Sequence, residues 1–416
     1  MNITNHEIQI AAQDALPPTF MALVLHIYGG KGHVLSYHRA LGEAIRLNGW
    51  IHLAVVSPDP KHAELPSEWF VEYIDSGVLD REGAEVIRLL KRLNLWVFIK
   101  SMYILGRDFT KVLRKELESR QNRKIIFLEC FNPLQLLSMV LSLLFVKREK
   151  LSVWLMYRGG PDWGGRKRRL MAKSFAIPFR IMNPIIELLI GKDNLMLLTD
   201  SEILSTSLPK YYKRTVHLVP IPHTPGQHGD NIQDARSHDR VVCWWPGAPR
   251  AEKGMGLIQR LVSVKDRDAH KVTLVAARST NLTDQEGCVR IEMVDDILAY
   301  QEYENRFFTS NLILLPYDQG IYGESTSGIF VECIVAGAIP LVTKGTWMAY
   351  ELEKRNLGEL AIDWTNNSVI QQIISLATSY SIEQKIKAMQ SEYRSFHCIP
   401  SFARAIHSLY KLLPSC

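Results

Sequence analysis

Short apolar, β-branched runs alternate along this chain with longer segments whose apolar residues recur every three or four positions. The short runs predict buried strands and the longer segments predict helices, so the alternation predicts βαβ units around parallel sheets. The chain is therefore expected to be an α/β protein. The predicted strands are residues 22–28, 51–57, 124–129, 151–157, 195–199 and 215–219 in the first half, and 241–245, 271–276, 289–293, 311–316 and 338–343 in the second.

A polar segment separates the two halves. Residues 223–240, HTPGQHGDNIQDARSHDR, are rich in turn formers and have no periodic apolar face. A chain of 416 residues fits two domains. We expect an N-terminal domain over 1–224, a linker over 225–237 and a C-terminal domain over 238–398, with a last helix over 401–413 that packs back on the first domain.

The cysteines and the N-terminus indicate the compartment. The six cysteines are dispersed, with no C-x-x-C pair and no Cys/His cluster at metal-ligand spacing, which is typical of reduced core thiols. The first residues have neither a basic n-region nor an apolar h-region. We therefore expect a cytoplasmic protein.

Net charge alone does not identify the partner, and the local apolar and basic segments allow more than one interpretation. The net charge of +6 suits phosphate-bearing molecules, an anionic membrane face or RNA. Four cations in 164–169 precede the apolar segment 170–190, and the apolar run 134–146 ends in a basic 147–150. Neither run reaches the roughly 18 to 20 apolar residues of a membrane span. Buried helices with a solvated basic loop, or a membrane-surface patch, both fit, whereas the basic segments lack the interleaved aromatic residues of a nucleic-acid site.

A glycine turn follows the first predicted strand. Residues 29–32 contain Gly30 and precede a helical pattern that begins at Val34 and stops at 48–49. Glycines at such a junction let the backbone approach a ligand, and free N–H groups at a helix start favour an anion. The turn is neither a complete G-x-G-x-x-G nor a P-loop, so a plain βα turn is the alternative.

Two glutamates stand after the predicted strand at 311–316. We expect a helix over 325–336, closed by a glycine, with Glu324 at its start, at the mouth of the sheet where ligands of doubly wound folds bind. Glu332 comes eight positions later, within about 80° of the same helical face. Because apolar residues flank Glu332, its carboxylate needs a buried partner.

These residues resemble those of the retaining glycosyltransferases of GT-B fold, family four and its relatives. The resemblance includes Glu324, Glu332, Gly337 and Pro340, and the segment 241–254, VVCWWPGAPRAEKG, which is similar to the strand, glycine turn and E-K-G of that family. It implies two Rossmann-like domains facing a central cleft. It also implies metal-independent transfer of a sugar, with retention, from a nucleotide-sugar donor to a glycan or lipid-linked acceptor, as in polysaccharide biosynthesis.

The resemblance also implies roles for single residues. Glu324 contacts the transferred sugar, and Lys253 with Arg250 neutralises the diphosphate, whose developing negative charge is stabilised most by cations fixed in a water-poor cleft. Glu332 binds the ribose hydroxyls. The other implied donor-binding residues are Gly30 facing the diphosphate from the first domain, Ser325 and Thr326 through their backbone N–H groups, and Ser327 and Gly328, which permit close approach.

Two positions depart from the family pattern. The family places an arginine directly after the glycine of its diphosphate motif, whereas this chain has Ala248 there and Arg250 two positions later. Many members also have a histidine at the end of the strand equivalent to 151–157. Here Arg158 and Asp162 are the candidates for the acceptor side of the cleft, with a tight structural turn as the alternative.

Other features have simpler explanations. Asp266 and Asp268 form a D-x-D, but it follows a predicted helix rather than a strand, so a metal site is not expected there. The tryptophans Trp244, Trp245 and Trp347 are expected in the core, although Trp347 could flank a nucleotide.

Two alternative functions and a membrane location stay open at this stage. A nucleotide-sugar epimerase shares the fold, and a catalytically silent nucleotide-sugar or glycan-binding subunit would tolerate the displaced arginine. The basic and apolar segments of the first domain also suggest peripheral association with the inner face of an anionic membrane, where a lipid-linked acceptor would enter.

Overall fold

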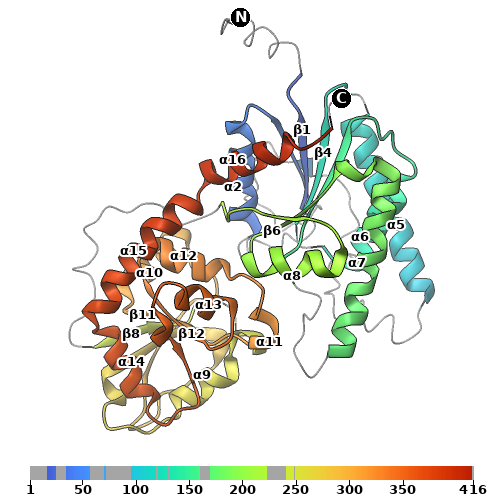
Figure 1. Cartoon of the computed structure of the whole chain (residues 1–416). Helices are drawn as coiled ribbons and strands as arrows, with labels where there is room; N and C mark the ends of the chain where they lie inside the picture. Colours follow the sequence, from blue (N-terminus) through green and yellow to red (C-terminus); the bar gives the residue numbers. More distant parts are fainter. Residues whose placement is uncertain are drawn as a thin grey trace, which may run out of the picture.

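The computed structural model describes residues 16–24, 34–56, 70–71, 95–118, 120–129, 131–159, 169–222, 240–247 and 249–414. They form two α/β units, each built on a twisted parallel sheet with helices around it (Figure 1). The predicted linker 225–237 lies outside the described residues.

The sheet of the first unit has seven strands, all parallel, in the order β3-β2-β1-β4-β5-β6-β7. Its central strands are buried along their whole length, as expected for a parallel sheet covered on both faces. The strands are β1 (Thr19–Val24), β2 (Ile51–Val56), β3 (Phe70–Val71), β4 (Lys124–Glu129), β5 (Leu151–Met156), β6 (Leu195–Thr199) and β7 (Val216–Leu218).

The second sheet has six parallel strands in the order β10-β9-β8-β11-β12-β13. Trp244, Trp245 and Trp347 are all buried in the core around it, which confirms their predicted core role. The strands are β8 (Val241–Trp244), β9 (Val272–Ala277), β10 (Arg290–Val294), β11 (Leu312–Leu315), β12 (Ile339–Thr343) and β13 (Ala361–Ile362).

Every strand expected from the apolar runs is present. Strand β1 begins three residues before and ends four residues before its predicted bounds, and the other predicted strands agree within one residue at each end. The runs failed to predict β3 and β13, because two residues are too few to form a periodic pattern. The two sheets and their helices confirm the predicted pair of Rossmann-like domains.

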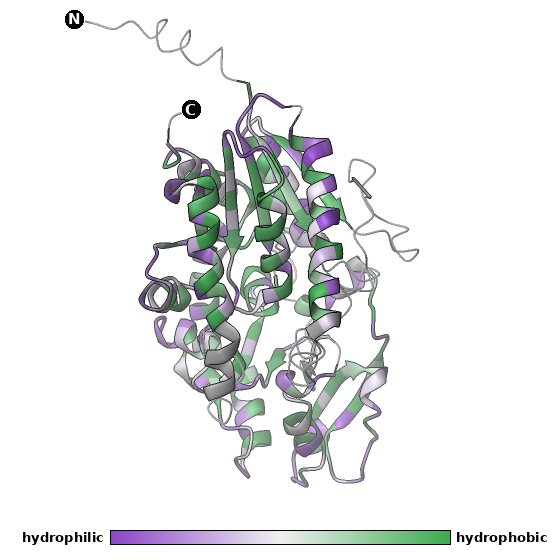
Figure 2. Ribbon diagram, turned by 90° about the vertical axis from the view of Figure 1, so that its right-hand side faces the viewer, coloured by the Kyte–Doolittle hydropathy of each residue, from purple (hydrophilic) through white to green (hydrophobic). Residues whose placement is uncertain are grey.

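Helices cover both faces of the first sheet. On one face α6 packs against both α5 and α7, and helices of this face stand side by side in Figure 2. The first-domain helices are α2 (Val34–Leu47), α5 (Leu95–Leu117), α6 (Pro133–Leu143), α7 (Arg169–Ile190), α8 (Glu202–Tyr212) and the 3₁₀ turn Lys192–Asn194.

The apolar segment 134–146 folds mainly as α6. A capping box starts this helix, with Asn132 and Gln135 each bonding the other's backbone N–H, and nearly all of its side chains are buried. The buried-helix interpretation is therefore correct for α6. In the described part of the chain, no helix is long and apolar enough to cross a membrane.

The second-domain helices are shorter. They are α9 (Met255–Val262), α10 (Tyr300–Thr309), α11 (Gln319–Tyr322), α12 (Gly328–Ala336), α13 (Trp347–Glu353), α14 (Val369–Ala377) and α15 (Tyr380–Phe396), with 3₁₀ turns η4 (Ala251–Lys253), η5 (Ala269–Lys271), η6 (Arg278–Thr280) and η7 (Gly358–Leu360).

The last helix, α16 (Ile399–Tyr410), leaves α15 and returns to the first domain, where it lies against α2 (Figure 1). Phe402 and Ile406 are fully buried there in one cluster with side chains of β1 and α2. The Asn48 amide donates to the Ala403 carbonyl at 2.9 Å. Part of the first domain's core is therefore built from the end of the chain.

Candidate donor and acceptor site

A buried lysine lies just beyond the end of β8. Lys253 ends η4 with 8% of its surface exposed, and its Nζ lies 5.7 Å from the ring centroid of Tyr317. Burial, and then the charge of Arg250, lower the pKa of Lys253 to about 8, while the carboxylates of Glu252 and Glu332 oppose the shift. A cation held in such a place is poorly hydrated and interacts strongly with an added anion.

Two glycines fix the position of this lysine. Gly254 has a φ of +85°, and a Cβ there would lie 2.1 Å from the Pro316 carbonyl oxygen, so only glycine allows the turn to touch the end of β11. Gly247 has a φ of +89°, and a Cβ there would lie 3.1 Å from Nζ of Lys253. Gly247 of the predicted glycine turn and Gly254 of the E-K-G motif therefore both help to position the ammonium group of Lys253.

Arg250 is placed differently from Lys253. Its side chain is 58% exposed and lies 3.4 Å from the Glu252 carboxylate. It is close enough to lower the pKa of Lys253, so the two cations do share one region. Of the two predicted diphosphate ligands, Lys253 is therefore held more firmly in place.

Glu332 is buried inside α12 and has the partner that its surroundings require. Tyr303, on α10, donates its hydroxyl to Oε2 of Glu332 at 2.5 Å. Burial, and then the Glu332 charge, raise the pKa of Tyr303 well above its usual value, so the hydroxyl stays protonated and donates. Sequence reasoning did not identify Tyr303, because its pairing with Glu332 joins separate helices.

The helix that carries Glu332 begins later than expected. It starts at Gly328, and Ser327 is its cap, with Oγ accepting from the Phe330 N–H at 3.3 Å. The prediction that Ser325 and Thr326 present backbone N–H groups from a helix N-terminus is therefore wrong. Three adjacent hydroxyl residues are all good caps, and the pattern could not choose among them. The first N–H groups without intrahelical acceptors belong to Gly328 and its successor.

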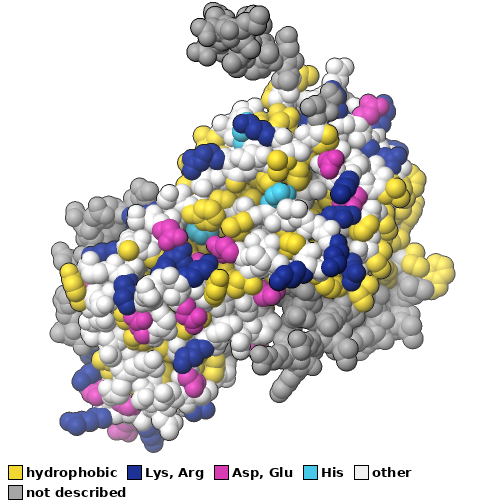
Figure 3. Space-filling view, viewed as in Figure 1, with side chains coloured by type: hydrophobic (Ala, Val, Ile, Leu, Met, Phe, Trp, Pro, Cys, Tyr) yellow, Lys and Arg dark blue, Asp and Glu magenta, His cyan; other side chains and the backbone are white. Residues whose placement is uncertain are grey.

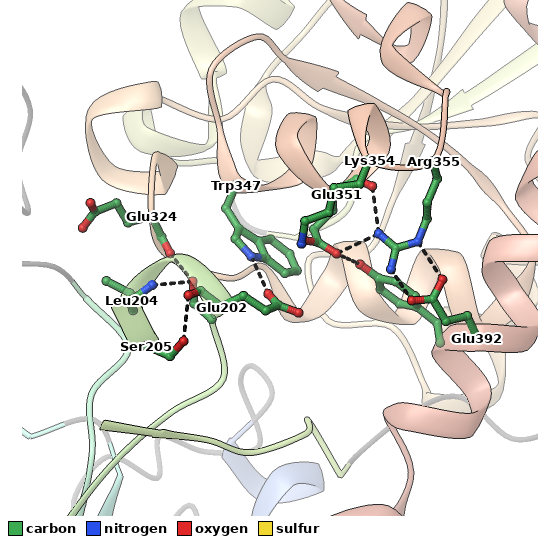
Figure 4. A network of polar contacts seen from close by, with 11 residues as sticks. Glu202, Leu204, Ser205, Glu324, Trp347, Glu351, Lys354, Arg355 and Glu392 are labelled. Carbon is green, nitrogen blue, oxygen red and sulfur yellow. Dashed lines mark hydrogen bonds and ion pairs between the residues drawn. The ribbon is translucent and has the colours of Figure 1, made fainter. Parts of the chain in front are cut away.

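The loop before α12 contacts the first domain. Ser201 donates its hydroxyl to the Glu324 carbonyl at 2.5 Å, and Ser207 donates to Oε2 of Glu324 at 3.3 Å. Thr326 donates to Oδ1 of Asp200 at 2.7 Å. In Figure 4 the Glu324 side chain extends away from Trp347. Glu324 thus stands where the two domains meet.

The acceptor-side candidate Arg158 follows β5 and is held by carboxylates on both neighbouring strands. Its guanidinium lies 2.8 Å from Glu129 at the end of β4 and 3.5 Å from Asp200 after β6. It also lies 4.7 Å over the ring of Tyr37, and Glu129 is 2.9 Å from His38. The ends of three parallel strands thus bring one charged cluster to the edge of the sheet that faces the second domain.

This cluster is continuous with the loop of Glu324. Asp200 is almost fully buried and contacts both Arg158 and Thr326, so it joins the first-domain cluster to the loop two residues after Glu324. Sequence reasoning missed Asp200 and Glu129. The predicted site residues Gly30 and Asp162 lie outside the described residues.

The remaining candidates have structural contacts. Asp266 and Asp268 accept from the Gln371 amide at 3.0 and 2.9 Å, and Asp268 also pairs with Lys271 at 2.6 Å. Trp347 donates its indole N–H to Glu202 at 3.3 Å (Figure 4). Over the described ranges, no group of three or more His, Cys, Asp or Glu side chains is arranged to hold a metal ion.

Comparison with known proteins gives the fold its context. No protein-family model matches the chain, and no curated protein matches it. Among solved structures, the N-terminal domain of Candida albicans trehalose-6-phosphate phosphatase is similar at a TM-score of 0.65 and 11% identity, over 96% of this chain and 98% of that one. An α,α-trehalose 6-phosphate synthase of Burkholderia multivorans is similar at a TM-score of 0.61 and 10% identity, over 96% of this chain and 97% of that one.

A third solved structure is the E. coli trehalose-6-phosphate protein bound with UDP-2-fluoroglucose. It is similar at a TM-score of 0.62 and 10% identity, over 96% of this chain and 99% of that one. The fold is that of the GT-B glycosyltransferases. The likeness covers 96% of this chain and therefore extends through both domains.

Exchange of Glu332 for glutamine tests the ribose assignment. Tyr303 can donate to the amide oxygen of Glu332→Gln, so we expect a folded protein with about 10-fold weaker binding of a nucleoside or nucleoside diphosphate, since hydrogen bonds to a charged acceptor are stronger. Inorganic pyrophosphate binding should be unchanged, as calorimetry would show. Loss of folding, or equal loss for pyrophosphate, would contradict the assignment. Tyr303→Phe is the matched variant that leaves the carboxylate in place.

Binding of a diphosphate should depend on pH above the pKa of Lys253. With a pKa of about 8 in the unliganded protein, the ammonium is lost as the pH rises through that value. The terminal phosphate of the ligand is already ionised there, because its second pKa is roughly 6. We expect affinity to fall about 5-fold between pH 8 and 9, as the protonated fraction of Lys253 falls. Lys253→Met should bind weakly with a flat profile, and a native profile that stays flat would refute the idea.

Proposed function

We propose that this protein transfers a sugar from a nucleotide-sugar donor, with retention of anomeric configuration. The observation that carries the proposal is the joint placement of buried Lys253 and buried Glu332 beside one another, with Glu324 at the domain junction. The donor's diphosphate, ribose and transferred sugar need a cation, an acceptor of hydroxyl protons and a carboxylate, respectively.

Each of these groups has a distinct task in the proposed reaction. When the bond between sugar and diphosphate breaks, negative charge grows on the leaving diphosphate. The buried ammonium of Lys253 stabilises this charge. The N–H groups at the start of α12 add to the same field. Glu332 holds the ribose, and Glu324 lies against the sugar. Arg250, being exposed, contributes less.

The proposed donor is supported by the solved structures as well as by the residues. The E. coli structure holds UDP-2-fluoroglucose, and the Burkholderia protein is named as a trehalose 6-phosphate synthase. The acceptor faces the first domain, beside the cluster of Arg158, Glu129 and Asp200. We propose a glycan or lipid-linked acceptor, in a cytoplasmic pathway of polysaccharide synthesis.

A panel of nucleotide sugars tests this function. With a suitable glycan or lipid-linked acceptor, the native protein should release free nucleoside diphosphate and form a glycoside, and release should stop without acceptor. Conversion of the sugar without transfer would indicate an epimerase. Tight binding of a donor with no turnover over the full acceptor panel would indicate a silent binding subunit.

The proposed reaction needs no metal ion, because Lys253 and the α12 N-terminus supply positive charge at the diphosphate. We expect turnover in EDTA to equal turnover without it. Activity that EDTA abolishes and Mn²⁺ or Mg²⁺ restores would contradict the metal-independent mechanism.

A further inference from the structure

Exposed apolar side chains gather on one side of the first domain, on α5, α7 and the turn after α6. Eight of the fifteen large hydrophobic side chains that are exposed in the described part of the chain lie here. Figure 3 shows hydrophobic and basic side chains together along this edge of the molecule. They are Trp96, Ile99 and Tyr103 on α5, Leu144 and Phe145 after α6, and Ile177, Ile181 and Leu188 on α7.

On α5 these side chains form a single stripe. Trp96, 82% exposed, and Tyr103, 61% exposed, are separated by two helical turns on the same face. Further along the same face of α5 the exposed side chains are cations at helical spacing, namely Arg107, Lys111 and Arg114. The helix therefore presents aromatic side chains at one end and positive charge at the other, while its opposite face is packed in the core.

The stripe on α7 is apolar along its length. Ile177, Ile181 and Leu188 recur at helical spacing and are 49%, 50% and 85% exposed. Phe179 and Ile186 on the other face are buried in the core. Since the buried face already anchors this helix, the exposed stripe adds nothing to the fold that the structure describes.

The charge of this surface indicates what covers it. Five exposed cations lie on α5, three on the turn 147–150 and one on α7, whereas Glu149 is the one exposed carboxylate in 95–118, 133–150 and 177–190. A second copy of the chain would bring these cations against one another. An anionic lipid surface meets both the charge and the apolar stripes.

We propose that the exposed face of α5, α7 and the turn after α6, here called the helix face, docks on an anionic lipid bilayer. Trp96 and Tyr103 would lie at the level of the headgroups, where aromatic side chains concentrate, and the cations would contact lipid phosphates. The inference deepens the proposed function and rests on it for one consequence, a lipid-linked acceptor delivered to the first domain.

Sedimentation with vesicles tests the helix face directly, without donor or acceptor. We expect the native protein to pellet with vesicles of phosphatidylcholine and phosphatidylglycerol at low salt and to stay in solution with phosphatidylcholine alone. The variant Lys100→Gln/Lys111→Gln/Arg148→Gln should partition at least about 10-fold less, because three headgroup contacts are lost. Lys265→Gln/Arg267→Gln/Arg290→Gln, with three exposed cations removed from the second domain, should pellet like the native protein.

The apolar half of the helix face has its own variant. Trp96→Ser/Ile181→Ser/Leu188→Ser should melt at the native temperature, because these side chains are exposed, and should also lose vesicle binding. Native protein that remains in the supernatant at low salt, or face variants that pellet like the native protein, would overturn the inference. So would a native dimer in sedimentation velocity that the serine variant dissociates. Vesicle binding by a protein that fails every transfer assay would overturn the proposed function and leave the docking face standing.

Discussion

Replacement of Lys253 with methionine is expected to weaken the binding of nucleoside diphosphate about 10- to 100-fold. Methionine fills a similar volume but removes the charge, and a hydrogen bond to a charged partner contributes roughly 1.5 to 3 kcal/mol. Because Lys253 is buried, water cannot readily take its place beside the diphosphate. Calorimetry with the tightest binder among UDP, GDP and ADP gives the measurement.

The matching nucleoside separates this effect from general damage to the site. Its affinity should change less than about 3-fold in Lys253→Met, since no phosphate is present to contact the lysine. Lys265→Met, an exposed lysine of the same domain, is the control and should bind both ligands normally. Equal loss for nucleoside and diphosphate would assign Lys253 a purely structural role.

The second large effect is expected from Glu324→Gln, with kcat lowered about 100-fold or more and donor affinity within about 3-fold of native. The amide keeps the shape of the side chain and can still accept from Ser207. What it lacks is the negative charge that we propose lies beside the sugar, and loss of one preorganised electrostatic group typically costs 100- to 1,000-fold. Single-turnover assays with saturating donor would measure the chemical step.

Two further variants define the role of Glu324. Glu286→Gln, at an exposed position of the same domain, should retain native kcat. Asp200→Asn should lower kcat less than Glu324→Gln does, because Asp200 contacts Thr326 and Arg158 and is proposed to position the loop of Glu324 without touching the sugar. A Glu324→Gln enzyme with native kcat would show that the carboxylate only joins the domains.

The strands and the two motifs of the second domain were predictable because their signals are local. A buried parallel strand is a continuous apolar run, and the glycines at 247 and 254 are visible in the sequence because residues with a side chain rarely adopt their positive φ. Burial of Glu332 also followed from its apolar neighbours. The short strands β3 and β13 carry no such signal.

The missing parts of the site depend on distant residues. Tyr303 reaches Glu332 from another helix, and Asp200 reaches Thr326 across the domain junction. The spacing of side chains along the chain cannot reveal such pairs. The start of α12 was missed for a different reason, since Ser325, Thr326 and Ser327 are competing caps and only the backbone around them decides which one is used.

The return of α16 to the first domain has a consequence for synthesis on the ribosome. Phe402 and Ile406 belong to the cluster that contains side chains of β1 and α2, so the first domain lacks part of its interior until α16 emerges. The second domain, by contrast, has its sheet and surrounding helices once α15 has been made. During synthesis the second domain is therefore completed before the first. A chain that stops before residue 399 leaves apolar surface of the first domain exposed.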